Sequence, residues 1–324
     1  MARCVLRFDN CTAGAFGRGV GLADATSRLF CMHALAAVWG CATVLPPPRH
    51  MLSPAHNRGR LAPAAWTWSS YYDVAASWTD VLSEFSAPSP TAVTTTAPTI
   101  AELSAVARDG GVLDVRWPAG PMPNVDEVRA AGPRQDLAPK PLREWSPPSP
   151  EHCKRFDPAK WGLHLSRVVV AAVDKAQLDL FNSSFVAMHV RRGDKIAALG
   201  PAWANQTSVR EVAAIAHALR QGARPSVAGS VDAVFLATDE TNAVYIGALR
   251  YALRQIFAHV VFEWELVRCC MPDATHAFDN SFVFLVAMTL LTRAARFLEL
   301  APFWCSKVGF FGCVALESDN RCLS

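Results

Sequence analysis

Residues 185–195 read FVAMHVRRGDK, an apolar run that stops abruptly at two arginines. An apolar run of this length is typical of a strand buried on both faces of a parallel sheet. Open α/β sheets bind ligands at the carboxyl ends of their strands. Arg191 and Arg192 at such an end suit a phosphorylated ligand, because guanidinium groups pair bidentately with phosphate oxygens and stay charged. The alternative interpretation is a strand followed by a solvated charged turn.

Strand-like and helix-like segments alternate on both sides of this stretch. Hydrophobic spacing predicts helices over 22–39, 165–181, 208–219, 242–256 and 281–295, and strands over 4–8, 41–45, 231–237, 259–262 and 296–300. Such alternation predicts an α/β protein with parallel sheets and crossover helices.

The length and composition favour two folded domains. A chain of 324 residues with 51% hydrophobic and 18% charged residues can form large cores. We expect an N-terminal α/β domain over 1–164 and a C-terminal Rossmann-like domain over 165–324. Residues 88–150 hold 12 of the 22 prolines. We therefore predict an irregular region over about 86–150, with a loop at 86–100 and short strands near 112–113 and 115.

Composition excludes several classes of protein. A net charge of +3 is only mildly basic and gives no argument for a nucleic-acid partner, which would require a concentrated basic face, so none is expected. No Asp-x-Asp and no His/Cys cluster occurs near the charged strand end, so no metal is expected. The longest apolar run, 282–291, is too short to span a bilayer, and no signal peptide or anchor is visible. Among the 10 cysteines, the adjacent Cys269 and Cys270 are not expected to bridge each other.

Residues 189–195, HVRRGDK, resemble the H-x-R-R-x-D-K motif of the α1,6-fucosyltransferase and protein O-fucosyltransferase superfamily. The resemblance implies a GT-B fold of two Rossmann-like domains. It also implies transfer of fucose from GDP-fucose without a metal or other cofactor. In this reading Arg191 and Arg192 are catalytic, whereas His189, Asp194 and Lys195 bind the substrate.

Three weaker stretches occur in the order of that superfamily. Gly17 and Gly19 lie in a glycine-rich loop like the one that begins the family's first helix, although tight strand–helix packing also explains such a loop. The predicted strand before Asp239 ends in Thr-Asp-Glu, like the second motif of the family. Ser306 matches a serine of the third motif, Ser-Ser-x-Val-Gly. Asp239 would bind the substrate, or would only cap the helix that begins near Asn242. Ser306 would bind the substrate, or would only cap the last helix. The aromatic stretch 66–74 favours core packing over sugar stacking.

The chain departs from the family at two acidic positions. Leu199 stands where the α1,6-enzymes have a glutamate proposed to take the acceptor proton, and leucine cannot accept a proton. Ala287 or Met288 stands where those enzymes read the guanine edge with an acid. Transfer would therefore need another carboxylate, such as Glu211 or Glu240, or a mechanism with only weak assistance from a base.

These observations lead to one expected function and two alternatives. The leading hypothesis is an inverting, metal-independent fucosyltransferase that transfers fucose from GDP-fucose to a glycan or protein hydroxyl. The resemblance implies a location in the ER or Golgi lumen, which the sequons at Asn10, Asn182 and Asn205 support. One alternative is a non-catalytic relative that binds a nucleotide sugar or glycan. The other is an unrelated nucleotide-binding α/β protein.

Overall fold

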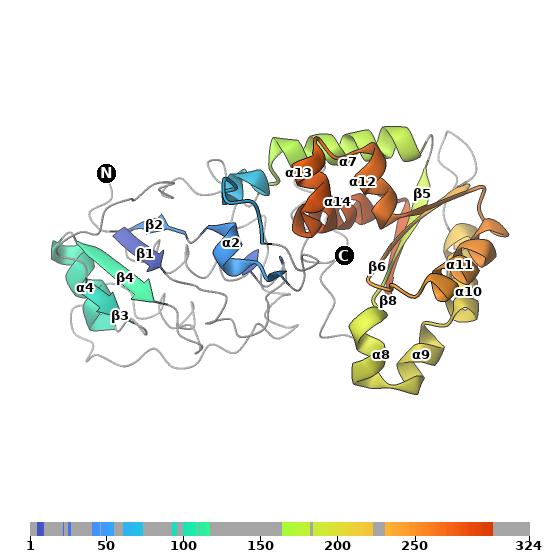
Figure 1. The fold of residues 1–324 in the computed structure, drawn as a ribbon, viewed down its shortest axis with the longest axis horizontal. Coiled ribbons are helices and arrows are strands. Elements are labelled where there is room, and N and C mark those ends of the chain that lie inside the picture. Colours follow the sequence, from blue (N-terminus) through green and yellow to red (C-terminus); the bar gives the residue numbers. More distant parts are fainter. Residues whose placement is uncertain are drawn as a thin grey trace. The chain divides into compact units, whose positions relative to one another are not determined.

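Parallel strands and flanking helices dominate the parts of the protein that the structure describes (Figure 1). The computed structural model describes residues 5–9, 22, 25–26, 41–45, 47–54, 61–73, 93–95, 100–109, 111–116, 164–181, 184–222 and 231–300. By their internal contacts, the residues divide into two units, Met1–Ser166 and Arg167–Ser324. The domain boundary predicted from the sequence lies two residues earlier. Each unit is described below by itself.

The first unit contains a four-stranded parallel sheet in the order β2-β1-β4-β3. Its strands are β1 (Val5–Asp9), β2 (Ala42–Val44), β3 (Val93–Thr95) and β4 (Val112–Arg116). Three short helical elements accompany the sheet: α2 (Pro48–Met51), η2 (Trp68–Ser70) and α4 (Ile100–Asp109). Leu22, Ala25 and Thr26 are helical and buried, whereas the rest of the helix predicted over 22–39 lies outside the described residues.

Two elements of this unit correct the sequence analysis. Strand β3 lies inside the segment predicted as a loop, and helix α4 lies inside the region predicted as irregular. Prolines on both sides obscured a helix-start signal, Thr-x-x-Glu at 99–102, and a stop signal, Gly-Gly at 110–111. The two short strands predicted near 112–113 and 115 form the single strand β4.

The aromatic stretch forms core, as the sequence favoured. Trp68, Tyr71 and Tyr72 are buried, and the Tyr71 ring contacts the Trp66 ring at a centroid distance of 5.5 Å. The Tyr72 hydroxyl lies 2.7 Å from the Thr26 hydroxyl, which satisfies both buried groups. Burial raises the pKa of the Tyr72 phenol far above its ordinary value. These side chains therefore stabilise the first unit from within.

The second unit is built on a parallel sheet in the order β7-β6-β5-β8. The strands are β5 (Phe185–Val190), β6 (Ala233–Thr238), β7 (His259–Phe262) and β8 (Arg296–Leu300). The longer helices are α7 (Arg167–Leu180), α10 (Val209–Gly222), α11 (Ala243–Arg254) and α14 (Asn280–Thr292). All four predicted strands and all four predicted helices of this unit are present, within three residues at each end.

Helices lie on both faces of the sheet in the second unit (Figure 1). Val186, Met188 and Val190 belong to the core that packs on α10 and α11. Side chains of the intervening positions point to the opposite face, as strand geometry requires. On that face Phe181, which follows α7, stacks on Phe185 with ring centroids 4.1 Å apart. Both faces of β5 are therefore covered, and only its carboxyl end is open for chemistry.

Several short elements were not predicted. The charged residues after β5 begin helix α8 (Gly193–Leu199) rather than a turn, and helix α9 (Pro201–Gln206) follows. Gly200 separates the two helices with a φ of 70°, a conformation that favours glycine, and Pro201 begins the second. Further along the chain lie η4 (Glu263–Glu265), α12 (Leu266–Cys269) and α13 (Ala274–Phe278).

A disulfide joins Cys269 to Cys270, so the expectation that they do not bridge is wrong.

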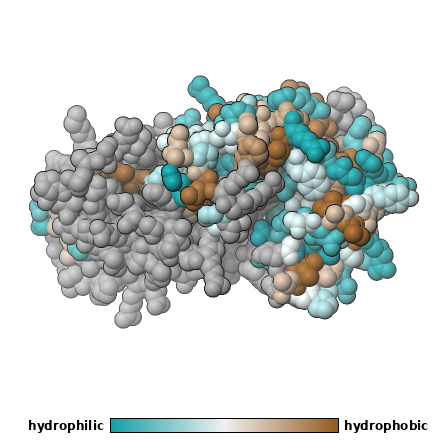
Figure 2. All heavy atoms as spheres, in the orientation of Figure 1, coloured by the Kyte–Doolittle hydropathy of each residue, from teal (hydrophilic) through white to brown (hydrophobic). Residues whose placement is uncertain are grey.

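Among the residues that the structure describes, no helix has the length and hydrophobicity needed to span a membrane. Helix α14, the most apolar, is buried along nearly its whole length and serves as core. Hydrophilic residues cover much of the visible face of the second unit, with separate hydrophobic spots between them (Figure 2). Scattered exposed hydrophobic side chains of this kind are normal on the surface of folded proteins.

Candidate functional site

The order of the strands places a ligand site at one end of β5. From β5 the chain moves to β6 and β7 on one side, and later returns to place β8 on the other side. The direction therefore reverses between β5 and β8. Open α/β sheets bind ligands outside the carboxyl ends of the strands at such a reversal. The residues that follow Val190 and Leu300 are thus the first candidates for ligand contact.

Asp239, which follows β6, organises the turn after β5. Its Oδ1 accepts the backbone N–H groups of Arg192 at 2.7 Å and Gly193 at 2.9 Å. Its Oδ2 lies 3.0 Å from Nε of Arg191. Asp239 thus bonds the amino-terminal end of α8, whereas Asn242 caps α11 by accepting from the backbone of Val244 and Tyr245. The alternative that Asp239 caps α11 is wrong.

Gly193 allows this close approach of two strand ends. A Cβ atom at this position would lie 2.8 Å from the backbone oxygen of Asp239 and 3.0 Å from its Oδ2. Both distances are shorter than ordinary carbon–oxygen contacts. The missing side chain therefore lets the β5–α8 turn dock on Asp239.

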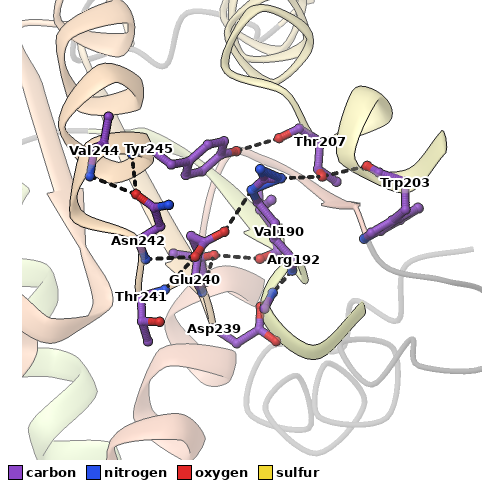
Figure 3. Close-up of polar contacts among 12 residues, drawn as sticks. Val190, Arg192, Trp203, Thr207, Asp239, Glu240, Thr241, Asn242, Val244 and Tyr245 are labelled. Carbon is purple, nitrogen blue, oxygen red and sulfur yellow. Dashed lines mark hydrogen bonds and ion pairs between the residues drawn. The ribbon is translucent and has the colours of Figure 1, made fainter. Parts of the chain in front are cut away.

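Arg192 is held inside the protein by side chains from three positions (Figure 3). Its Nε lies 2.8 Å from Oε2 of Glu240 and forms an ion pair with it. The angle at the Nε–H group is not that of a hydrogen bond. Its guanidinium lies 4.0 Å from the centre of the Tyr245 ring, and Nη1 donates to the Thr207 hydroxyl at 3.3 Å. Only 15% of its side chain is exposed. Arg192 thus links β5 to the residues that begin α11.

Glu240 and Tyr245 are fixed as firmly as Arg192. Oε1 of Glu240 accepts the backbone N–H groups of Thr241 and Asn242, both at 2.8 Å. The Tyr245 hydroxyl donates to the backbone oxygen of Thr207 at 2.6 Å. Burial raises the pKa of the Tyr245 phenol to about 12, an effect that Glu240 strengthens and Arg192 opposes. The three side chains form a closed polar cluster.

Arg191 has a different environment from its neighbour. Its backbone N–H donates to the Leu300 oxygen at 2.9 Å, and its carbonyl accepts from Nε1 of Trp203 at 2.9 Å. These bonds fix the backbone at the reversal between β5 and β8. The side chain is 27% exposed and pairs with Asp239 through Nε. Of the two arginines, Arg191 has the more exposed side chain.

His189 pairs with a carboxylate that the sequence did not assign to the site. Nδ1 of His189 lies 2.8 Å from Oε1 of Glu299, and the two residues face each other across β5 and β8. Both side chains are nearly buried, at 6% and 11% exposure. The sequence analysis could not find this contact, because the two residues lie 110 positions apart and their alignment depends on strand register.

The remaining predicted residues lie nearby or outside the described residues. Lys195 is half-buried in the first turn of α8, and Asp194 precedes it, although its side chain is not among those described. Gly17, Gly19 and Ser306 fall outside the described residues. Within the described ranges, no group of three or more His, Cys, Asp or Glu side chains is placed to hold a metal ion.

Solved structures of fucosyltransferases resemble this chain, whereas no protein-family model and no curated protein matches it. POFUT1 in complex with GDP-fucose is 12% identical, with a TM-score of 0.53 over 100% of this chain and 96% of that chain. POFUT1 in complex with GDP is 13% identical, with a TM-score of 0.51 over 96% and 94%. The NodZ α-1,6-fucosyltransferase soaked with GDP-fucose is 16% identical, with a TM-score of 0.47 over 95% and 90%.

The chain has the fold of POFUT1. The predicted fold class, α/β with GT-B architecture, is therefore confirmed, in line with the resemblance found at residues 189–195. Sequence identity this low shows the shared fold alone.

Within this POFUT1 fold, Leu199 and the pair Ala287 and Met288, which stand where the sequence analysis expected acidic residues, have different surroundings. Leu199 is half-buried at the end of α8, whereas Ala287 and Met288 are completely buried in α14. An acid at position 287 or 288 would lie in the core and would not reach a ligand. Of the two substitute carboxylates, Glu240 is held by Arg192, and Glu211 forms an ion pair of 2.9 Å with Arg210 at an exposed position of α10.

Replacing Gly193 with alanine is expected to lower the free energy of unfolding by about 1–3 kcal/mol, the usual cost of forcing an atom into a packed site. The backbone of Asp239 stands in the way of the new methyl group. Denaturant titration measures the loss. Gly247→Ala is the matched control, because its Cβ would meet nothing within 4 Å in the exposed middle of α11. That change should stabilise the protein by about 0.5–1 kcal/mol. Equal effects of the two substitutions would contradict the close approach at Gly193.

Proposed function

We propose that the chain is an inverting, metal-independent fucosyltransferase that transfers fucose from GDP-fucose to a glycan or protein hydroxyl. The observation that carries the proposal is the position of Arg191 at the strand reversal of a POFUT1 fold. The POFUT1 structures that share this fold hold GDP-fucose and GDP. A nucleotide sugar with a diphosphate has the charge that this arginine would bind.

The reaction breaks the bond between the anomeric carbon of fucose and a phosphate oxygen, and the bonding electrons leave with GDP. The acceptor oxygen forms the new bond to the opposite face of that carbon, and its proton passes to a general base or to solvent water. Negative charge therefore grows on the diphosphate in the transition state, and a fixed cation there lowers the barrier. Arg191 would supply this charge, and Arg192 would keep the strand end in place for it.

Transfer should persist when divalent metals are removed. Arginine can stabilise the leaving diphosphate without a metal, so we expect equal release of GDP from GDP-fucose in EDTA and in manganese. The measurement is a GDP-release assay with candidate glycan and glycoprotein acceptors. Activity that disappears in EDTA and returns with manganese would refute the metal-independent mechanism.

A non-catalytic relative that binds GDP-fucose is the second candidate, and Leu199 specifically favours it. A positioned general base typically contributes about 10²–10⁴-fold in rate. Leucine at this position cannot act as a base, and Glu240 is already held by Arg192. We therefore expect binding of GDP-fucose to be easier to detect than its turnover.

Replacing Leu199 with glutamate separates the two candidates. If a base is missing there, the glutamate is expected to raise turnover by about 10²-fold or more in one acceptor screen beside the wild type. Leu199→Gln, which adds a similar side chain without a base, serves as the control. Ordinary turnover by the wild type and no gain in Leu199→Glu would place the base elsewhere. Binding without turnover in both proteins would favour the non-catalytic candidate.

We also propose a location in the secretory pathway. The disulfide between Cys269 and Cys270 suits an oxidising compartment. Asn205, in the sequon Asn-Gln-Thr, lies exposed near the end of α9. Both observations fit the ER and Golgi lumen, where glycans and glycoproteins occur as acceptors.

A further inference from the structure

We propose that Asn205 carries an N-linked glycan and that this glycan is attached before the second unit folds. The inference goes beyond the proposed function and rests on the proposed location, because the ER lumen holds the enzyme that transfers such glycans. It starts from the sequon Asn205-Gln206-Thr207, which lies at the end of α9 and just before α10. The glycan donor is an oligosaccharide joined through a diphosphate to a membrane lipid.

The Asn205 side chain has room for a glycan in the folded protein. It is exposed, as is the neighbouring side chain of Gln206. Its amide group has no hydrogen-bond partner among the described residues. The other two sequon asparagines, Asn10 and Asn182, lie outside those residues. Folding therefore leaves the Asn205 side chain free to hold a bulky, hydrophilic group.

Thr207, the hydroxyl residue of the sequon, is completely buried. Its hydroxyl donates to the Trp203 oxygen at 2.7 Å and accepts from Nη1 of Arg192 at 3.3 Å (Figure 3). The Tyr245 hydroxyl donates to the backbone oxygen of Thr207 at 2.6 Å. A sequon needs a serine or threonine hydroxyl at this position, so the enzyme must reach it. Because the folded protein covers this hydroxyl, it is a poor acceptor.

The order of synthesis leaves the sequon open for a limited time. Tyr245, which closes over Thr207, lies 38 positions later in the chain. Glu240, which pairs with Arg192, also comes later, and both residues follow β6. A chain that grows by about 5–20 residues per second needs about 2–8 s to extend by this length. The buried arrangement of Thr207 therefore forms only after the enzyme has had access to the sequon.

The transfer forms one bond and breaks one. The amide nitrogen of Asn205 attacks the anomeric carbon at the reducing end of the oligosaccharide, and the bond from that carbon to the lipid diphosphate breaks. The bonding electrons leave with the diphosphate, and the nitrogen gives one proton to a base of the enzyme. No oxidant or reductant is needed.

Mass spectrometry tests the site on the full chain, produced in eukaryotic cells behind a cleavable signal peptide that delivers it to the ER. Removal of the glycans with peptide N-glycosidase, in water labelled with heavy oxygen, converts each glycosylated asparagine into a labelled aspartate. We expect this label at Asn205. An unlabelled Asn205 in the delivered chain would overturn the inference.

Variants of the three sequon residues show whether the sequon itself is read. Asn205→Gln should lose the mass of one glycan, and so should Thr207→Val, which keeps the shape of the side chain without its hydroxyl. Thr207→Ser keeps a hydroxyl and should retain the glycan. Gln206→Ala is the matched control, because it changes an exposed neighbour and preserves the sequon. An unchanged glycan mass in Asn205→Gln would overturn the inference.

Cell-free synthesis of the full chain tests the timing. Solubilised oligosaccharyltransferase and its lipid-linked donor are added either during synthesis or after folding is complete. We expect about tenfold less transfer to Asn205 in the second case, because the Thr207 hydroxyl is then reachable only when its surroundings open locally. A short peptide with the same sequon, added in both cases, checks that the enzyme is equally active. Equal transfer to the chain in both cases would overturn the proposed order of events.

GDP-fucose binding, measured on the same preparations, separates this inference from the proposed function. An unlabelled Asn205 in a protein that binds GDP-fucose would overturn the inference and leave the proposed function intact. A labelled Asn205 in a protein that does not bind GDP-fucose would support the inference and overturn the proposed function.

Discussion

Replacing Arg191 with alanine should weaken GDP-fucose binding by about 2–4 kcal/mol, the scale of losing one partner of a desolvated charge pair. The backbone of Arg191 is fixed at the strand reversal by Leu300 and Trp203, so ligand binding by its guanidinium would need no further ordering of the backbone. Calorimetry measures the loss. Arg191→Lys should recover little of it, because a lysine cannot form the two parallel hydrogen bonds of a guanidinium.

Folding stability provides the contrast for this prediction. The ion pair of Arg191 with Asp239 is partly exposed, so its loss should change the free energy of unfolding by less than about 1 kcal/mol. The control is Arg210→Ala, whose side chain is 90% exposed on α10 and should affect neither binding nor stability. Unchanged affinity in Arg191→Ala would move the ligand away from β5 and remove the main support for the proposed function.

Replacing Arg192 with alanine should instead lower the free energy of unfolding by about 3 kcal/mol. Its loss would leave the carboxylate of Glu240, only 9% exposed, without its cation and would remove the contact with the Tyr245 ring. Urea denaturation measures the change as a lower midpoint with an unchanged slope. Arg191→Ala is thus expected to lower mainly the affinity for GDP-fucose, whereas Arg192→Ala is expected to lower mainly the folding stability.

A double substitution checks the cause of that instability. In Arg192→Met combined with Glu240→Gln no buried charge is left alone, so part of the stability should return. In the opposite outcome, Arg192→Ala folds as stably as the wild type but no longer binds GDP-fucose. That result would mean that Arg192 contacts the ligand and that its role is not to stabilise the cluster with Glu240 and Tyr245.

The sequence predicted the second unit well because its signals are local. The apolar run of β5, the helix periodicities and the charge after Val190 each depend on neighbouring residues, and the structure confirms the elements they predicted. The prediction failed where proline content outweighed a local signal, at β3 and α4. It also failed at α8, since a short charged segment with glycine resembles a turn.

The candidate site was predictable only in its location. The pairing of His189 with Glu299 depends on the register of β5 and β8, which no local pattern specifies. The different environments of Arg191 and Arg192 depend on the side chains that follow β6, which hold one arginine by Asp239 and the other by Glu240. Two identical residues that are adjacent in sequence therefore have different partners and different exposure.

The bonds from Asp239 to the Arg192 and Gly193 amides also have a kinetic consequence. These two amides belong to no strand, yet their protons are donated to a side chain that follows β6. The turn can therefore open only when the ends of β5 and β6 separate, and its amide hydrogens should exchange with solvent as slowly as those of the sheet. The entropy of ordering this turn is then lost during folding rather than on binding, so an arriving ligand meets a surface that is already rigid.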